Sequence, residues 1–94
     1  AALERLNYIY PLDEDAHRKL GDLLLAQNDV PGAVREYQAV VAGKPLDQAL
    51  SHFQLAKALQ LAHRADDARE QILLSLEAAP GYKPAQQLLL ELSK

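Results

Sequence analysis

Apolar residues recur at intervals of three and four positions along most of the chain, and short polar stretches interrupt them. Such spacing is typical of the buried face of an α-helix. A first stripe follows Asp13, an expected N-cap, and stops at Asn28. A second begins near Pro31, a residue that fits the first turn of a helix, and stops at Gly43. The stripes are Ala16, Leu20, Leu23, Leu24 and Ala26, then Ala33, Val34, Tyr37, Val40 and Val41, and the short connection between them predicts a helical hairpin.

The pattern is then repeated. Asp47 takes the capping role of Asp13, and an apolar stripe continues to a turn at His63. A helix with an acidic first turn at Asp66 and Asp67 follows, and it ends before Pro80. Shorter apolar patterns predict one more helix at each end, with Leu3, Leu6 and Ile9 in the first and Leu88, Leu89 and Leu92 in the last.

The two hairpins are copies of one arrangement. Leu20-Gly21, Leu24, Ala33, Tyr37 and Pro45 return about 35 residues later as Leu55-Ala56, Leu59, Ala68, Ile72 and Pro80, and His17 returns as His52. Gly21 falls in the middle of a helix, where Gly costs roughly 1 kcal/mol relative to Ala, so we expect a close helix contact there. Stacked hairpins of this length offer a surface suited to binding rather than a cleft suited to chemistry.

Composition and charge narrow the classes of function. Leu and Ala dominate, Thr and Cys are absent, and the formal net charge is -3. Without a basic block or a long apolar run, neither nucleic acid nor a membrane is expected as a partner, and we expect a soluble chain. The compartment stays open, because the absence of Cys fits both a cytosolic and an exported protein. The first six residues do not have the pattern of a signal peptide, so no targeting segment is expected in this sequence. Because residue 1 is Ala and Met is absent, we expect a processed or excised piece of a longer chain.

At these repeated positions the chain resembles the tetratricopeptide repeat (TPR) family, whose pattern runs Leu-Gly, large apolar, Ala, aromatic, Pro. The resemblance covers residues 14–80 directly. It implies an all-α fold, a right-handed superhelix of αα-hairpins with about two full repeats, an N-terminal half-repeat helix and a C-terminal capping helix. One domain, 1–94, is expected: the tail of a preceding repeat at 1–10, repeat 1 at 14–47, repeat 2 at 48–82 and a capping helix at 84–93. The departures from the family pattern are His17 and His52 for a large apolar residue, Asn28 and His63 for Gly, and Val40 and Ser75 for Ala.

In this family the first helix of each hairpin lines the concave face, so the resemblance implies that a partner segment binds there. The implied contacts are Arg18, Asp22, Leu25, Phe53, Lys57, Gln60 and Leu61, with Ala26, Gln87 and Glu91 beside them. A family clamp for acidic C-termini needs Asn where Asp22 stands, so peptides of mixed charge fit better. Packing between neighbouring helices explains Leu25, Phe53 and Leu61 equally well, and the sequence leaves both interpretations open.

No catalytic, cofactor or metal site is predicted. His17 and His52 fall on neighbouring helices, but no third ligand accompanies them, and packing or surface roles explain them better. Ser51, Ser75 and Ser93 lack a His and an acid at the spacing of a known motif. The paired acids lie at helix starts, where capping accounts for them. A metal-bearing four-helix bundle would need Glu-x-x-His pairs, which are absent.

The first hypothesis is therefore a non-enzymatic module that binds a peptide or helix of another protein on its concave face. The alternative is a structural or assembly domain, such as the C-terminal appendage of a larger enzyme or secretion component, that packs within its own chain or self-associates. Because the end units of a repeat array lack a neighbour, a weak homodimer through exposed terminal helices is the self-association we expect.

Overall fold

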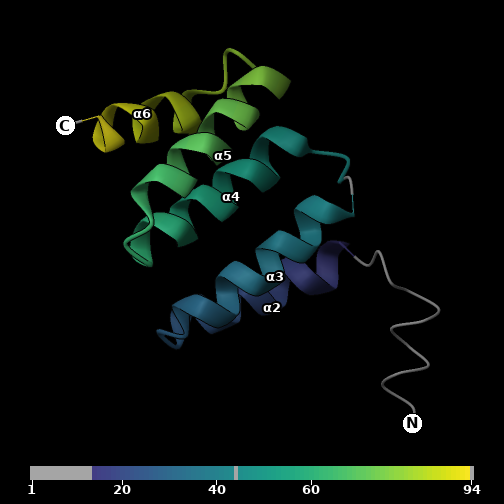
Figure 1. The fold of residues 1–94 in the computed structure, drawn as a ribbon. Helices are drawn as coiled ribbons and strands as arrows, with labels where there is room; N and C mark the ends of the chain where they lie inside the picture. The colour runs from purple at the N-terminus through teal and green to yellow at the C-terminus, as the bar shows by residue number, and fades with distance from the viewer. Residues whose placement is uncertain (1–13, 44, 94) are drawn as a thin grey trace, which may run out of the picture.

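The computed structural model describes residues 14–43 and 45–93, which form five helices stacked in chain order (Figure 1). They are α2 (Glu14–Ala26), α3 (Val30–Ala42), α4 (Gln48–Leu61), α5 (Ala65–Ala78) and α6 (Lys83–Leu92). Hairpin α2–α3 is followed by hairpin α4–α5 and then by α6, with no strand in these ranges. The predicted all-α hairpin repeat is confirmed. The helix expected around Leu3, Leu6 and Ile9, and the cap expected at Asp13, lie outside the described residues.

Two helix starts depend on aspartate caps, of which the one at Asp47 was predicted and the one at Asp29 was not. The Asp29 carboxylate accepts a hydrogen bond from the Gly32 amide at 3.1 Å, and Asp47 accepts one from the Leu50 amide at 3.0 Å. Each bond satisfies an amide that has no partner within its own helix. Pro31 occupies the first turn of α3, where its missing N–H costs no helix hydrogen bond. The pattern of caps therefore defines where α3 and α4 begin.

The turns inside the two hairpins have the same geometry. Asn28 and His63 adopt left-handed backbone conformations, with φ of 64° and 62°. In each turn the residue after them donates its amide back to a helix carbonyl, Asp29 to Leu24 and Arg64 to Leu59. This is the Schellman arrangement, in which glycine is the favoured left-handed residue. Asn28 and His63, which stand where the family pattern has Gly, therefore adopt a backbone conformation that Gly would adopt without strain.

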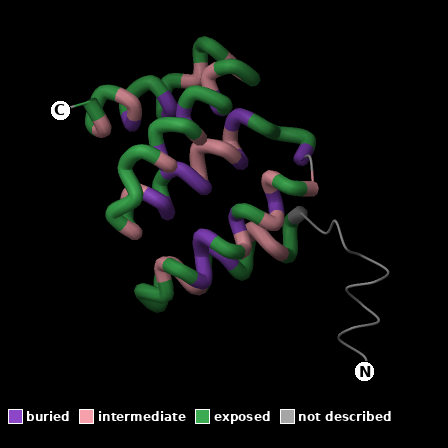
Figure 2. The backbone as a smooth tube through the Cα atoms, in the orientation of Figure 1, coloured by how far each residue is buried: buried purple, intermediate pink, exposed green. Residues whose placement is uncertain are grey.

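The core lies between α3, α4, α5 and α6, where most of the buried residues face one another (Figure 2). Leu55 and Leu59 of α4 and Ile72 of α5 are almost completely buried. The core is made of Ala33, Val34, Tyr37, Leu55, Ala56, Ala58, Leu59, Ala68, Ile72, Ala85 and Leu88. Ser75 is also buried, and its hydroxyl donates a 2.6 Å hydrogen bond to the Ala49 carbonyl, joining α5 to the first turn of α4.

Helix α2 differs from the expected amphipathic pattern. Of its predicted inward stripe, only Leu24 is partly buried, whereas Ala16, Leu20, Leu23 and Ala26 are exposed. The reason is that α3 is the one described helix that packs extensively against α2. The equivalent stripe of α4 is buried because α3, α5 and α6 surround that helix. The predicted buried role of Leu20 and Leu23 is therefore wrong for the described part of the chain.

The close contact predicted at Gly21 is present. A Cβ atom added there would lie 2.8 Å from Cε1 of the Tyr37 ring, well inside normal contact distance. In the second hairpin the equivalent residues are Ala56 and Ile72, and both are completely buried. In each hairpin, a small residue of the first helix accompanies a large residue of the second. The pair is Gly21 with Tyr37 in the first hairpin and Ala56 with Ile72 in the second.

Candidate functional site

A hollow of about 200 Å³ lies between α4 and α6. It is lined by Phe53, Lys57, Gln60, Pro84, Gln87, Leu88 and Glu91, and these residues define the α4–α6 hollow. The α4 residues are four and three positions apart, and those of α6 fall three, one and three apart, so each helix contributes one face. Phe53, Lys57 and Gln60 were all predicted contacts, with Gln87 and Glu91 expected beside them. The structure brings these five together.

Phe53, which lines the α4–α6 hollow, belongs to an aromatic pair with Tyr82. The rings of Phe53 and Tyr82 meet edge to face, with centroids 5.8 Å apart and an angle of 81° between their planes. This is a favoured geometry for aromatic rings. Partial burial raises the pKa of the Tyr82 hydroxyl above its usual 10, and the negative charge of Asp47 adds to the shift. Tyr82 is the residue before α6, so the pair also fixes where that helix starts against α4.

The hollow carries one cation and one anion. The Lys57 ammonium lies 5.8 Å from the centroid of the Phe53 ring, within reach of a cation–π attraction. Glu91 comes from the last turn of α6. Across residues 14–43 and 45–93, neither Lys57 nor Glu91 forms an ion pair. Both charges therefore face solvent beside an apolar floor, which is the chemistry of a recognition surface.

Arg18 joins the two hairpins. Its guanidinium donates from Nε to Gln54 at 2.8 Å and from a terminal nitrogen to the Ser51 hydroxyl at 2.6 Å. Ser51 is buried and in turn donates to the Asp47 carbonyl at 2.8 Å. These contacts connect α2 to the start of α4. Arg18, a predicted partner contact, thus stabilises the junction between hairpins.

The remaining predicted contacts are not gathered at the hollow. The Asp22 carboxylate accepts a hydrogen bond from the Tyr37 hydroxyl inside the first hairpin. Burial first, and this bond second, raise the pKa of Tyr37 well above its usual 10. Leu25 is partly buried and packs against the core, whereas Leu61 is exposed and does not line the hollow. The packing interpretation fits Leu25, and Phe53 combines packing with exposure to the hollow.

The two repeated histidines hold the helices of each hairpin together. Nδ1 of His17 lies 2.9 Å from Oε1 of Glu36, and Nδ1 of His52 lies 2.7 Å from Oε1 of Gln71. Both contacts span nineteen positions and join the first helix of a hairpin to its second. In the described ranges no group of three His, Cys, Asp or Glu side chains is placed to hold a metal ion. Their geometry is that of repeated structural contacts.

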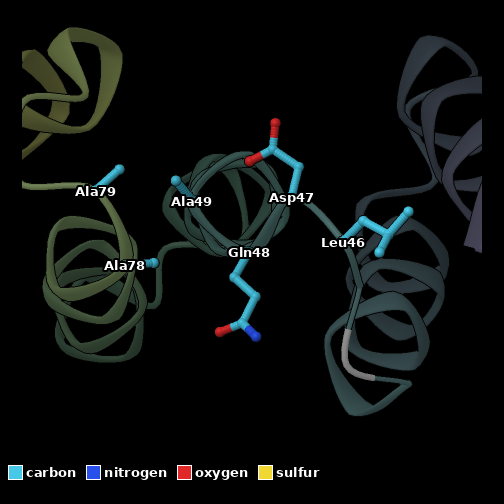
Figure 3. Close-up of a pocket in the computed structure, with 6 residues that line it drawn as sticks. All are labelled: Leu46, Asp47, Gln48, Ala49, Ala78 and Ala79. Atoms are coloured by element: carbon cyan, nitrogen blue, oxygen red, sulfur yellow. The ribbon is translucent and has the colours of Figure 1, made fainter.

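A second hollow, of about 400 Å³, lies at the junction before α4 (Figure 3). Leu46, Asp47, Gln48 and Ala49 line one side, and Ala78 and Ala79 of the second hairpin line the other. Asp47 brings the one charge, and its carboxylate caps α4. In Figure 3 the Gln48 side chain points away from that carboxylate. Half of the residues that line this hollow are alanines, and the Asp47 carboxylate is already engaged as a helix cap. It is therefore a weaker candidate for a binding site than the α4–α6 hollow.

Three residues of the candidate site were not predicted as contacts. Pro84 and Leu88 of α6 line the hollow, and Tyr82 supports Phe53. The sequence signal was present for Tyr82, an aromatic residue two positions before the proline that opens α6. Tyr82 was not predicted because it lies in the connection before α6, whereas the expected contacts were chosen from helix positions.

The repeated hairpins, with equivalent turns, histidine contacts and packing pairs, define a helical-hairpin repeat protein. The model of the tetratricopeptide repeat family matches residues 1–48 and 18–83, which together span most of the chain, and the chain belongs to this family. Among curated proteins, nothing matches it. The family indicates a protein-interaction or scaffold module, generally without catalytic activity. Within the described ranges, every helix is too short or too polar to cross a bilayer.

Proposed function

We propose that the chain is a non-catalytic interaction module that binds a segment of a partner protein on its concave face, at the hollow between α4 and α6. This is the concave face that the family resemblance implies. The observation that carries the proposal is the α4–α6 hollow, in which Phe53 and Leu88 provide an apolar floor and Lys57 and Glu91 provide charges without ion-pair partners among the described residues. Pockets that bind peptides combine these same two elements.

Calorimetric titration against a pool of short peptides tests the proposal. Phe53→Ala and Lys57→Ala are each expected to weaken the tightest peptide, because one removes the floor and the other the cation. Leu73→Ala is the control, since Leu73 is an exposed apolar residue of α5 that does not line the hollow. Circular dichroism checks that Phe53→Ala still folds. A peptide that binds all three variants as tightly as the unaltered chain would show that this face is not the binding surface.

The assembly role is the second candidate, and exposed leucines on the first and last described helices, α2 and α6, favour it. Leu20 and Leu23 are exposed on α2, and Leu90 of α6 is 68% exposed. Apolar side chains at both ends of a repeat array are suited to weak self-association. Sedimentation equilibrium is expected to show a mass that rises with protein concentration and falls back in a Leu20→Ser, Leu23→Ser, Leu90→Ser variant. A constant monomer mass at the highest attainable concentration contradicts this role.

A further inference from the structure

We infer that the α4–α6 hollow binds an extended peptide segment in which an apolar, an acidic and a basic side chain occur in that order, at every second position. The inference rests on the proposed function and specifies the chemistry of the partner. Its basis is the order of groups along the hollow, the spacing of the helix positions that carry them, and the two charges that no described residue neutralises.

The order follows from how α4 and α6 are aligned. Each hairpin reverses the chain, so α4 and α6, which alternate with α5, run in the same direction (Figure 1). The contact of Phe53 with Tyr82 places Phe53 beside the start of α6. Glu91 lies at the end of α6, beyond Lys57 along the hollow. From one end to the other, the hollow therefore presents the Phe53 ring, then the Lys57 cation, then the Glu91 anion.

The spacing selects an extended partner. A helix rises about 1.5 Å per residue, so Lys57 lies about 6 Å beyond Phe53 along α4, and Glu91 lies about 13.5 Å along α6 beyond Tyr82, the residue that contacts Phe53. An extended chain advances about 6.6 Å over two residues and returns its side chains to the same face. Alternate side chains of such a segment thus match the successive levels of the hollow. Long acidic and basic side chains can adjust for the slightly longer interval between Lys57 and Glu91.

Charge complementarity assigns the acidic and basic positions. The ammonium of Lys57 attracts a carboxylate next to the apolar side chain, and the carboxylate of Glu91 attracts a cation one level further. The amides of Gln60 and Gln87 line the same hollow, and each can both donate to and accept from a peptide backbone. A uniformly acidic or uniformly basic segment would meet one repulsive charge, so the mixed order is favoured.

Fluorescence anisotropy with labelled peptides tests the order. The probes are a Leu-Ala-Asp-Ala-Lys peptide, its reversed sequence for the opposite chain direction, and a Leu-Ala-Lys-Ala-Asp peptide in which the charges are exchanged. The tighter of the first two is expected to bind about tenfold more strongly than the exchanged peptide, with a smaller difference at high salt. Such a difference is what two exposed ion pairs can supply when attraction is replaced by repulsion.

A double variant, Lys57→Glu with Glu91→Lys, provides the matching test. It keeps the net charge and is expected to prefer the exchanged peptide. The control is Arg35→Glu on α3 with Glu77→Lys on α5, two exposed positions outside the hollow; it also keeps the net charge and is expected to leave the preference unchanged. Equal affinity of the unaltered chain for both charge orders overturns the inference, and so does a preference that the double variant fails to invert. If Phe53→Ala weakens peptide binding but the two charge orders bind equally well, the proposed function stands and the inference about charge order fails. If Phe53→Ala has no effect on peptide binding, both the proposed function and the inference fail.

Discussion

The two hairpins share turns, histidine contacts and helix spacing, yet they differ in how much of the shared pattern is buried. Leu55 of α4 is 2% exposed, whereas Leu20, its equivalent in α2, is 43% exposed. Helix α4 packs against α3, α5 and α6, and α2 packs mainly against α3. The same residue at the same repeat position is a core residue in one unit and a surface residue in the other. Burial in a repeat protein therefore depends on the neighbouring unit as much as on the residue.

A second difference links packing to binding. In the first hairpin Tyr37 occupies the large position, and its hydroxyl requires Asp22 as an acceptor. In the second hairpin Ile72 takes that position and needs no acceptor. Lys57, the equivalent of Asp22, is consequently free of this role and lines the α4–α6 hollow. The choice of a tyrosine or an isoleucine in the core thus decides whether the facing surface position serves the fold or can serve a partner.

The largest expected effect is the difference in stability between an alanine substitution at Leu55 and one at Leu20. Leu55→Ala is expected to lower the free energy of unfolding by about 3 kcal/mol, because it leaves a cavity in the core. Leu20→Ala is expected to cost about 1 kcal/mol or less, since much of that side chain already contacts water. Urea denaturation of both variants measures the difference. Equal costs would show that Leu20 is covered in solution and would remove the contrast between the hairpins.

The pH dependence of stability tests the role of Tyr37, the large core residue of the first hairpin, whose counterpart Ile72 does not titrate. Because the pKa of Tyr37 is raised by burial, the folded chain holds that proton more tightly than the unfolded chain, whose Tyr titrates near 10. The resulting stability is complete below pH 10 and is lost as the pH rises beyond it, by at most about 1.4 kcal/mol per pH unit. Urea denaturation at pH 9, 10 and 11 is expected to show this loss in the unaltered chain and a smaller one in Tyr37→Phe. Parallel curves for the two proteins would contradict the assignment of this loss to Tyr37.

The Gly21–Tyr37 and Ala56–Ile72 packing pairs predict that Gly21→Ala changes from destabilising to stabilising when Tyr37 is replaced by Ile. Gly21→Ala is expected to destabilise the chain by about 1 kcal/mol, because the clash with the Tyr37 ring outweighs the better helix propensity of Ala. In a Tyr37→Ile background, which imitates the second hairpin, the same substitution is expected to stabilise by up to about 1 kcal/mol. Thermal unfolding of the four proteins in this cycle measures both effects. A destabilising effect of equal size in both backgrounds would mean that the tyrosine ring does not require the glycine.

The smallest effects concern the turns. His63→Gly is expected to raise the free energy of unfolding by about 0.5–1 kcal/mol, because Gly adopts a positive φ without strain. Asn28→Gly is expected to gain less, since Asn tolerates this conformation better than His. Chemical denaturation of the two variants gives the comparison. A loss of stability in His63→Gly would show that its side chain contributes more than its backbone conformation costs.

The parts of the fold that depend on local or repeated sequence were predicted from the sequence. The cap at Asp47 was expected and is confirmed, and the predicted break at Asn28 has the geometry of a helix end. The contact at Gly21 was expected because Gly is unfavourable inside a helix. The exposure of Leu20 was not predicted because it depends on which helix covers α2. The role of Arg18 was missed for a similar reason, since Gln54 and Ser51 belong to the next unit.

The candidate site was predicted in part. The family resemblance pointed to Phe53, Lys57 and Gln60, and the structure brings them to one hollow with Gln87 and Glu91. It pointed equally to Asp22 and Leu25, whose side chains serve the first hairpin, because repeat equivalence alone does not show which copies of a position remain available. The difference arises from core residues such as Tyr37 and Ile72, whose effect on the facing surface appears only when the helices are packed.

Amide chemical-shift mapping of the full chain with the Leu-Ala-Asp-Ala-Lys peptide, or its reversed sequence if that binds more tightly, tests the central claim most directly. The claim is that the second hairpin and α6 form the binding surface, while α2 chiefly supports the fold. We predict shifts concentrated at Phe53, Lys57, Gln60, Gln87 and Glu91, with little change along α2. Shifts centred on Arg18, Asp22 and Leu25, with the α4–α6 hollow unaffected, would contradict it.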